Sequence, residues 1–269
     1  MPDSLDYYRR AWDKKPLLQR IYNDFYDRIA CWRVDGRSIE IGGGIGQFKG
    51  RFPDVIATDI QAASWLDVVT DAQRLPFADN SISNIVMVDA LHHIEFPLLF
   101  LREAERVLRT GGRCIMVEPG ITMGSTIFYR CFHHEPVRMR VDPLIRGTPN
   151  AGRDPYDSNQ AIPTLLVGRE RARLTKLIPT LSLIRSDWFS LIVYPLSGGF
   201  RPWALLSDRV GRYLLSLERK LEPLFGHILG FRLLIVLEKR AFLIRKREGR
   251  LAHIADAPLR NSSLTMRGR

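Results

Sequence analysis

The sequence predicts an α/β fold in which helices cover both faces of a doubly wound, mostly parallel sheet. Three observations support this prediction. Apolar runs of strand length alternate with helical segments over residues 37–119, a glycine-rich turn follows the first run, and two more apolar runs lie in the C-terminal third. Strands that alternate with helices in this way are typical of parallel sheets with crossover helices.

Size and composition fit one globular domain. The chain has 269 residues, of which 45% are hydrophobic and 26% charged, and a chain of this length can bury a substantial core. We expect one domain over residues 1–249 and a disordered tail over residues 250–269. No apolar leader and no stretch of the ~20 apolar residues that span a bilayer is expected. Only three widely spaced cysteines occur, so a cytoplasmic location is expected.

The positive charge is confined to the C-terminal half. Residues 1–159 hold 20 Lys and Arg against 21 Asp and Glu, a net charge of −1. Residues 160–269 hold 20 against 8, a net charge of +12. This basicity favours peripheral contact with an anionic surface such as the inner face of a membrane, although a solvated basic face explains it equally well. Residues 238–250, a basic and apolar run, are the candidate contact segment.

The first half predicts two helical regions and five strands. Residues 5–33 have apolar side chains at helical spacing, and Pro16 divides this region. Residues 96–112, FPLLFLREAERVLRTGG, show a second amphipathic pattern, and Gly111 and Gly112 are expected to end that helix as its C-cap. The five strands are RSIEIG, VIATDI, LDVVTD, ISNIVMVDA and RCIMVEP.

The pattern changes after Pro119. Residues 120–165 are rich in Gly, Pro, His and Arg and have no sustained period, so we expect a long insertion there. The closing part, residues 181–240, contains two apolar runs and one amphipathic segment. The elements predicted beyond the insertion are helix 168–179, strand 181–194, helix 208–225 with Ser207 or Asp208 as N-cap, and strand 231–240.

The turn after the first strand, IEIGGGIGQF, indicates which ligand the fold can hold. A dinucleotide-binding turn has the spacing G-x-G-x-x-G, whereas Gly42, Gly44 and Gly46 follow at G-x-G-x-G. Glu40 precedes them, where a carboxylate suits a cationic amino-acid group better than a pyrophosphate. Asp59 ends the next strand, where its oxygens can accept bonds from two ribose hydroxyls. NAD is therefore disfavoured, and a P-loop is excluded because no Gly-Lys-Ser/Thr follows.

Four segments in the correct order carry a family resemblance. E-x-G-x-G-x-G, then TDI, then DAQRLPFADNSISNIVMVDALHHI, then RVLRTGGRCIMVEP resemble the class I S-adenosylmethionine-dependent methyltransferases of the bacterial small-molecule or glycan type. The resemblance covers residues 37–119, which would form the cofactor-binding core. It implies a Rossmann-like, seven-stranded sheet that ends in a C-terminal antiparallel hairpin. An N-terminal helix and a cap after the fifth strand would complete the fold, with S-adenosyl-L-methionine as cofactor.

The resemblance also implies roles for the matching residues. The cofactor-binding set is Glu40, Gly42, Gly43, Gly44 and Gly46 around the methionine part, Asp59 at the ribose, Ile60, Asp71 and Ala72 at the adenine, and Asp89 facing the sulfonium and the acceptor. One feature departs from the family, because residues 61–66 leave too little chain for the usual helix before the third strand. We expect an irregular loop there, with Trp65 and Leu75 lining the adenine pocket.

Histidines and acids near the insertion are the candidate catalytic groups. His134, His93, Asp89 and Glu135 could act as a general base towards an acceptor hydroxyl. His134 and Glu135 could equally tie the insertion to the core, and His92 and His93 could be packing or capping residues. No ligand set with familiar metal spacing occurs, so no metal is expected.

Two further segments are candidates for the acceptor side. Tyr156, Asp157, Asn159 and Gln160 suit a polyhydroxy acceptor or are turn residues. Residues 194–200, YPLSGGF, could be a mobile hinge. With Trp203 and the 208–225 helix, this hinge could form a lid over a bulky or lipid-linked acceptor.

The function that follows is methyl transfer from S-adenosyl-L-methionine. We expect O-methylation of a small-molecule, sugar or lipid-linked glycan acceptor. Methylation of a quinone-like or other lipid ring is the alternative, and a non-catalytic module that keeps the cofactor fold is another. Nucleic acid is an unlikely partner because Asp-Ala-Leu-His, not N/D-P-P-Y, follows the fourth strand. The sequence leaves the oligomeric state open.

Overall fold

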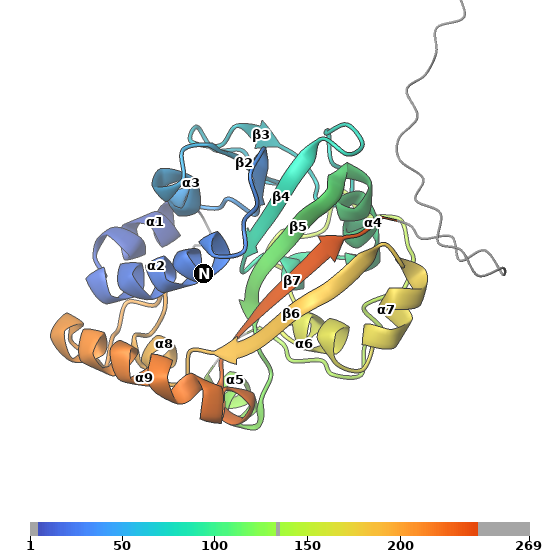
Figure 1. The fold of residues 1–269 in the computed structure, drawn as a ribbon. Coiled ribbons are helices and arrows are strands. Elements are labelled where there is room, and N and C mark those ends of the chain that lie inside the picture. The colour runs from blue at the N-terminus through green and yellow to red at the C-terminus, as the bar shows by residue number, and fades with distance from the viewer. Residues whose placement is uncertain (1–4, 133–134, 242–269) are drawn as a thin grey trace, which may run out of the picture.

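The computed structural model describes residues 5–132 and 135–241, and it contains a seven-stranded sheet with helices on both faces (Figure 1). The strands are β1 (Ser38–Ile41), β2 (Val55–Asp59), β3 (Val68–Val69), β4 (Ile82–Val88), β5 (Leu108–Pro119), β6 (Leu181–Phe189) and β7 (Arg232–Lys239). The helices are α1 (Leu5–Asp13), α2 (Pro16–Ala30), α3 (Gln47–Arg51), α4 (Pro97–Val107), α5 (Met123–Phe132), α6 (Ile162–Val167), α7 (Arg171–Leu177), α8 (Val193–Leu196) and α9 (Asp208–Leu229), with a short 3₁₀ turn η1 (Leu91–His93).

The sheet has the topology that the resemblance implies. Its strand order is β3-β2-β1-β4-β5-β7-β6. Strands β1 to β5 run parallel, and β7 pairs antiparallel with both β5 and β6. The predicted fold class is therefore confirmed, including the antiparallel C-terminal hairpin.

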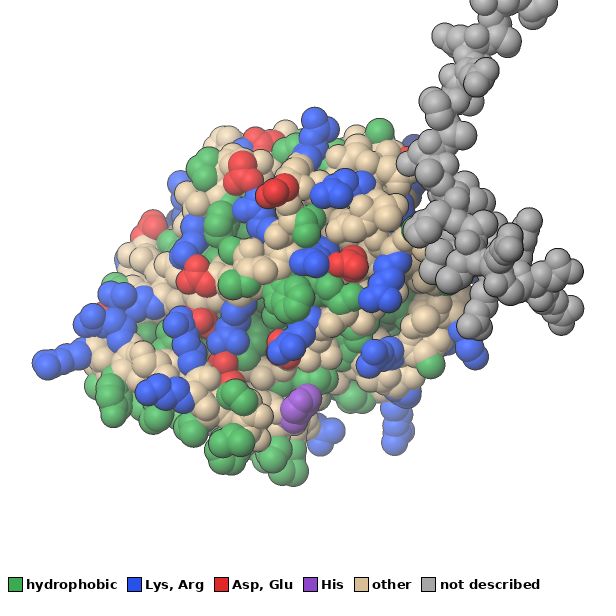
Figure 2. All heavy atoms as spheres, viewed as in Figure 1, with side chains coloured by type: hydrophobic (Ala, Val, Ile, Leu, Met, Phe, Trp, Pro, Cys, Tyr) green, Lys and Arg blue, Asp and Glu red, His purple; other side chains and the backbone are tan. Residues whose placement is uncertain are grey.

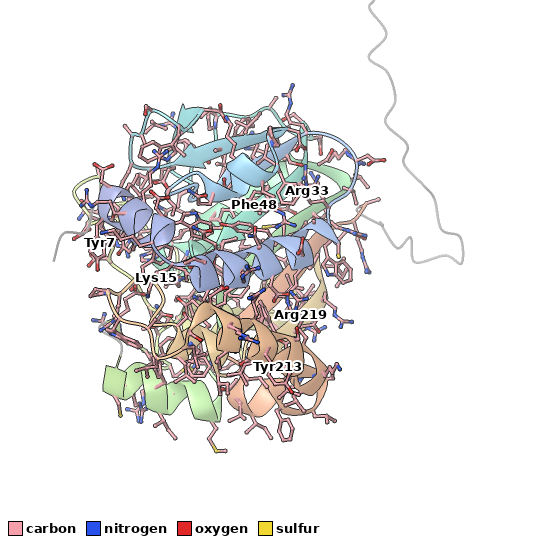
Figure 3. All side chains as sticks on the ribbon, turned by 90° about the vertical axis from the view of Figure 1, so that its left-hand side faces the viewer. Tyr7, Lys15, Arg33, Phe48, Tyr213 and Arg219 are labelled. Atoms are coloured by element: carbon pink, nitrogen blue, oxygen red, sulfur yellow. The ribbon has the colours of Figure 1, made fainter. Side chains whose placement is uncertain are left out.

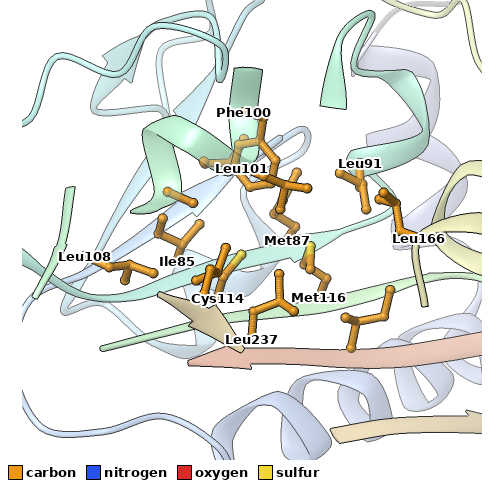
Figure 4. Close-up of a cluster of buried hydrophobic side chains, with 14 of the residues drawn as sticks. Ile85, Met87, Leu91, Phe100, Leu101, Leu108, Cys114, Met116, Leu166 and Leu237 are labelled. Carbon is orange, nitrogen blue, oxygen red and sulfur yellow. The ribbon is translucent and has the colours of Figure 1, made fainter. Parts of the chain in front are cut away.

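Alternating side chains of the central strands divide the core into two layers. On β4, Ile85 and Met87 face the layer covered by α4, α6 and α7, which Figure 4 shows. Val86 belongs to the other layer, which α2, α3 and α9 cover. Successive strand residues point to opposite faces, so strands buried on both sides read as continuous apolar runs. The runs of the central strands are continuous for this reason, whereas β3, with Val69 56% exposed, lies in the short run LDVVTD.

The glycine pair after α4 has a different role from the predicted one. The helix ends at Val107, and β5 already begins at Leu108. The predicted C-cap at Gly111 and Gly112 is therefore wrong. Gly111 has a φ of 77°, and a Cβ on Gly112 would lie 2.8 Å from the Arg109 carbonyl oxygen. The pair forms an irregular stretch at the start of the strand, where the pairing with β4 shifts register.

The C-terminal third contains more helix than predicted. The insertion holds α5, and the predicted helix 168–179 is present as the shorter α7, preceded by α6, which ends at Gly168. Strand 181–194 ends at Phe189, after which Ser190 has a φ of 59° and the chain turns into α8. Helix α9 extends to Leu229, beyond the predicted 225, and Ser207 caps it by accepting a bond from the Val210 amide. The predicted tail over 250–269 lies outside the described residues.

Candidate active site

A cavity of about 670 Å³ lies where the parallel strands end, which is where open α/β sheets bind ligands. Its volume is within the range of about 300–1,000 Å³ that is usual for small-molecule sites. One part of its lining comes from the turn after β1 and the residues that follow β2, β3 and β4. The other part comes from α1, α2, α5, the 153–160 loop, the 194–203 segment and Arg232.

The glycine turn is shaped for close approach of a ligand. Gly42 has a φ of 72°, and a Cβ there would lie 2.5 Å from the Ala90 side chain. The Gly43 amide donates to the Thr58 carbonyl over 2.8 Å, which ties the turn to the end of β2. Gly46 does not line the cavity; it begins α3 with a φ of 79° and packs against Trp65. The first three glycines therefore form the cradle, and the fourth shapes the turn.

Glu40 presents a buried carboxylate to this cradle. Its Oε2 has no hydrogen-bond partner within the part of the chain that the structure describes. Burial, together with the nearby charge of Asp59, raises the pKa of Glu40 well above its usual range. A ligand ammonium group would compensate both carboxylates, because a buried charge needs a partner.

The residues expected at the adenosine lie along the same wall of the cavity. Asp59 is buried, and its two oxygens accept bonds from the Gly44 amide and the Gln61 amide, each over 2.9 Å. Ile60 is exposed at the cavity, and Asp71 and Ala72 also line it. The Asp71 carboxylate accepts bonds from the backbone amide and side chain of Gln73. Carboxylate lone pairs remain for hydroxyl and amino donors, so the wall fits an adenosine.

Comparison with known proteins identifies the class. Residues 39–116 match the family described as a methyltransferase domain, and that segment contains the cradle, Asp59, Asp71 and Asp89. A solved structure of a SAM-dependent methyltransferase from Archaeoglobus fulgidus has the same fold, with a TM-score of 0.50 and 12% identity over 82% of this chain and 94% of that one. Residues 39–116 thus carry a methyltransferase domain, and the sheet around them has the fold of S-adenosylmethionine-dependent methyltransferases, with S-adenosyl-L-methionine as the cofactor that such a domain implies.

Curated relatives match a little over a third of this chain. The ubiquinone/menaquinone biosynthesis C-methyltransferase UbiE of Pseudomonas savastanoi is 27% identical over 38% of this chain and 48% of its own length. The UbiE of Cellvibrio japonicus is 29% identical over 38% of this chain and 50% of its own length. The chain thus spans about half the length of the curated relatives it matches.

The loop before β3 is irregular, as predicted, but its two named residues lie elsewhere. Trp65 donates its ring N–H to the Gly44 carbonyl over 2.8 Å and supports the glycine turn from outside the cavity. Leu75 is buried in the core layer beneath α4. Neither residue lines the cavity, so the expected lining of the adenine pocket by these side chains is wrong.

Asp89 is held between a tyrosine and an arginine. It follows β4 with a φ of 54°. Tyr22 on α2 donates to its Oδ2 over 2.8 Å, and Arg232 at the start of β7 forms an ion pair with its Oδ1. Since both oxygens already accept bonds from strong donors, this geometry favours a positioning role over proton abstraction. Tyr22 and Arg232 were not among the predicted site residues.

His92 lies between two carboxylates, which favour its charged form. Its Nδ1 lies 2.7 Å from Glu118 and its Nε2 lies 3.4 Å from Glu135. Burial lowers the pKa of His92, but the bonds to the two carboxylates outweigh burial and raise this pKa to about 10. Ser158 and Gln160 also donate to Glu135. Glu135 is therefore the acceptor of several donors, a poor arrangement for a general base.

His93 is the predicted base that is best placed. It lines the cavity, and its Nδ1 has no hydrogen-bond partner among residues 5–132 and 135–241. Burial and the neighbouring charge of His92 lower the pKa of His93 to about 4, so its ring is neutral at pH 7. A neutral ring nitrogen can accept a hydrogen bond from an acceptor hydroxyl. His134, the other histidine candidate, lies outside the described residues.

Ligand atoms of three of these residues also lie close together. The candidate atoms of His92, His93 and Glu135 are within 4.8 Å of one another, a grouping that could hold a metal ion. Both ring nitrogens of His92 already face carboxylates, those of Glu118 and Glu135, so we assign no metal. The expectation of a metal-free site stays a prediction.

The 194–203 segment is tied to the N-terminal helices rather than hinged freely. The Nζ of Lys15, at the junction of α1 and α2 (Figure 3), lies 2.7–2.9 Å from four backbone carbonyl oxygens, which share its three N–H donors. These carbonyls belong to Ser197, Gly199, Arg201 and Trp203. Three aromatic side chains of the same segment, those of Tyr194, Phe200 and Trp203, line the cavity. One lysine therefore holds this wall in place.

Replacing Lys15 with methionine is expected to loosen this wall while leaving the glycine cradle intact. The free energy of unfolding should fall by roughly 2–3 kcal/mol, because each hydrogen bond from a charged group contributes about 1.5–3 kcal/mol and Lys15 is only partly buried. Thermal unfolding and S-adenosylhomocysteine affinity measured together test this. The exposed neighbour Lys14, changed to methionine, is the matched control. Equal stability of both variants would contradict the clamp.

Proposed function

We propose that the protein transfers a methyl group from S-adenosyl-L-methionine to an oxygen of a small, ring-bearing acceptor that carries an acidic group. The acceptor half of the cavity supports this proposal. Its lining is dominated by aromatic side chains, namely Tyr7, Tyr8, Tyr22, Phe128, Tyr129, Tyr156, Tyr194, Phe200 and Trp203. Rings of this kind bind another ring or an apolar chain by stacking and by burial of area.

The state of Arg232 is the observation that supports an acidic group on the acceptor. Arg232 is buried in the cavity wall, with its guanidinium 4.1 Å from the centre of the Tyr194 ring. Its Nη1 binds Asp89, whereas its Nε has no hydrogen-bond partner in the described part of the chain. An unpaired donor on a buried cation is suited to an anionic oxygen of a ligand.

The chain's own groups would then align and prepare the acceptor. When bound, S-adenosyl-L-methionine supplies an electrophilic methyl group and its leaving group. Arg232 would anchor the acidic group, and the Nδ1 of His93 would accept the hydrogen bond of the reacting hydroxyl. Alignment of this kind contributes roughly 7–11 kcal/mol in well-oriented systems. The enclosing rings and the clamped 194–203 segment would exclude water from the reacting atoms.

A sugar or lipid-linked glycan acceptor has less support than expected from the sequence. Tyr156 and Gln160 line the cavity, but Asp157 and Asn159 do not. Asn159 bonds the Arg138 amide and carbonyl and so stabilises the loop itself. Methylation of a quinone-like ring, the alternative from the sequence, fits the aromatic lining and remains the second candidate.

Transfer of a labelled methyl group to paired acceptors tests the proposal. Hydroxyaryl carboxylates should be labelled at oxygen, and their neutral methyl esters much less. Arg232→Gln should raise the KM for the acid at least about tenfold, because it removes the charge that pairs with the acceptor. Its S-adenosylhomocysteine affinity should be retained, and Arg232→Lys should recover part of the loss. Labelling of sugars instead, or equal use of acid and ester, would overturn the acidic ring acceptor.

A further inference from the structure

A stripe of exposed apolar side chains runs along α9. Val210, Tyr213, Leu217, Leu224 and Ile228 are spaced so that they share one side of the helix, and Tyr213 and Leu224 are 74% and 72% exposed. The opposite side of the helix packs on the protein through Leu215 and buried polar groups. Tyr213 is visible on α9 in Figure 3. A soluble surface helix normally has polar groups where this stripe lies.

Helix α5 continues the same apolar face. Met123 and Ile127, one turn apart, are 72% and 64% exposed. The two helices abut, since a Cβ on Gly124 would lie 2.9 Å from the Leu229 side chain. Figure 2 shows the apolar side chains gathered along the lower edge of the molecule, over α9 and α5. We call this surface the α5–α9 face.

Helix α5 has one side on the α5–α9 face and the other side on the cavity. Phe128 and Tyr129 on the inner side of α5 line the cavity, while Met123 and Ile127 lie on its outer side. Trp203, which also lines the cavity, is exposed on the adjoining segment. An apolar molecule that reaches this face is therefore one helix diameter from the acceptor rings.

Exposed cations border the face. Arg209 and Lys220 lie beside the stripe on α9, and Arg130 follows Ile127 on α5. An apolar stripe with Arg and Lys at its edge is the pattern of a helix that lies in the surface of an anionic bilayer. Within residues 5–132 and 135–241, no helix is long and apolar enough to cross a membrane.

We propose that the α5–α9 face docks on an anionic membrane surface and that the acceptor enters the cavity from there. The identity of the acceptor rests on the proposed function, whereas the docking does not. A second copy of the chain is a poorer occupant, since a twofold contact through this face would bring its bordering cations together. The membrane contact expected from residues 238–250 falls mostly outside the described residues, and α9 provides a contact independent of that run.

Flotation of the full chain with vesicles tests the docking. Binding is expected to phosphatidylglycerol-containing vesicles and to be much weaker with pure phosphatidylcholine. The double variant Leu224→Ser/Ile228→Ser should bind anionic vesicles at least about tenfold less, because two apolar side chains no longer insert. Arg209→Ser/Lys220→Ser should lower the binding and its salt dependence. Ile145→Ser, a change at a 51% exposed residue away from the face, should bind as the wild type does.

Two results would overturn the proposal. One is equal flotation of the wild type and Leu224→Ser/Ile228→Ser. The other is a stable dimer by light scattering that this double variant abolishes, with no vesicle binding by the wild type. Methyl transfer to a water-soluble ring acid, measured without vesicles, separates the two proposals. A variant that transfers normally but does not float keeps the proposed function, and a wild type that floats but does not transfer keeps the docking face.

Discussion

Asp59→Ala is expected to weaken binding of S-adenosylmethionine and S-adenosylhomocysteine by at least about 100-fold, since each hydrogen bond to a charged group contributes about 1.5–3 kcal/mol. The variant would lack the carboxylate that is expected to accept bonds from two ribose hydroxyls. It would also lose the bond from the Gly44 amide, 2.9 Å long, which holds the cradle closed. The change therefore removes a ligand contact and the support of the turn that forms the other half of the site.

Titration calorimetry with both cofactor forms measures this effect. Asp59→Asn is the graded variant, because it keeps the shape and one acceptor oxygen and should lose less affinity than the alanine variant. Asp54→Ala, at an exposed acid just before β2, is the matched control and should bind normally. Unchanged affinity in a folded Asp59→Ala protein would reject the ribose assignment.

The sheet could be predicted because each of its central strands produces a recognisable pattern within a short segment of the sequence. Each central strand is buried on both faces, so it appears as an uninterrupted apolar run, and the glycine turn has its spacing within one short segment. Helix α5 could not be found in this way. Its residues, MGSTIFYRCF, include Gly, Ser and Thr, which disfavour helix interiors. The helix starts with reciprocal bonds between Thr122 and Ser125, a variant of the capping box with serine at its third position.

The cavity wall expected to hold the cofactor could be predicted for the same reason, whereas the opposite wall could not. The acid after each strand lies in one motif with fixed spacing. The partners of Asp89 come from α2 and from β7, 67 and 143 residues away in the chain. Lys15 lies 182 residues or more from the carbonyls it binds. Such pairings arise from tertiary packing, and no spacing rule in a single sequence reveals them.

A weak signal for two missed residues was nevertheless present. Glu118 and Arg232 are charged residues at the ends of otherwise apolar runs, VEP and FRLLIV. A charge at the end of a buried strand must find a partner or face a site. Glu118 accepts bonds from the Ala90 and Leu91 amides and from His92, and Arg232 pairs with Asp89. A charged residue at the end of a central strand therefore indicates a site residue, as a glycine turn does.

His92→Gln is expected to cost stability at neutral pH by about 3–5 kcal/mol, the usual effect of removing one partner from a buried ion pair. The loss should depend on pH, because the pKa of His92 is about 10 in the folded protein and near 6.5 in an unfolded chain. The charged ring therefore stabilises the fold fully below pH 6.5. This stabilisation is lost progressively as the pH rises from 6.5 to about 10, at up to roughly 1.4 kcal/mol per pH unit.

Urea unfolding of the wild type and the variant between pH 6 and pH 10.5 isolates this contribution, because the tyrosines and lysines that titrate in this range are common to both. The difference in free energy of unfolding should be largest at pH 6 and should shrink towards pH 10. His227→Gln, at an exposed histidine on α9, is the matched control for loss of an imidazole ring. A pH-independent difference for His92→Gln would mean that the ring is neutral between Glu118 and Glu135. In that case the two carboxylates would need another cation, and the metal-binding geometry of His92, His93 and Glu135 would become the better explanation of the cluster.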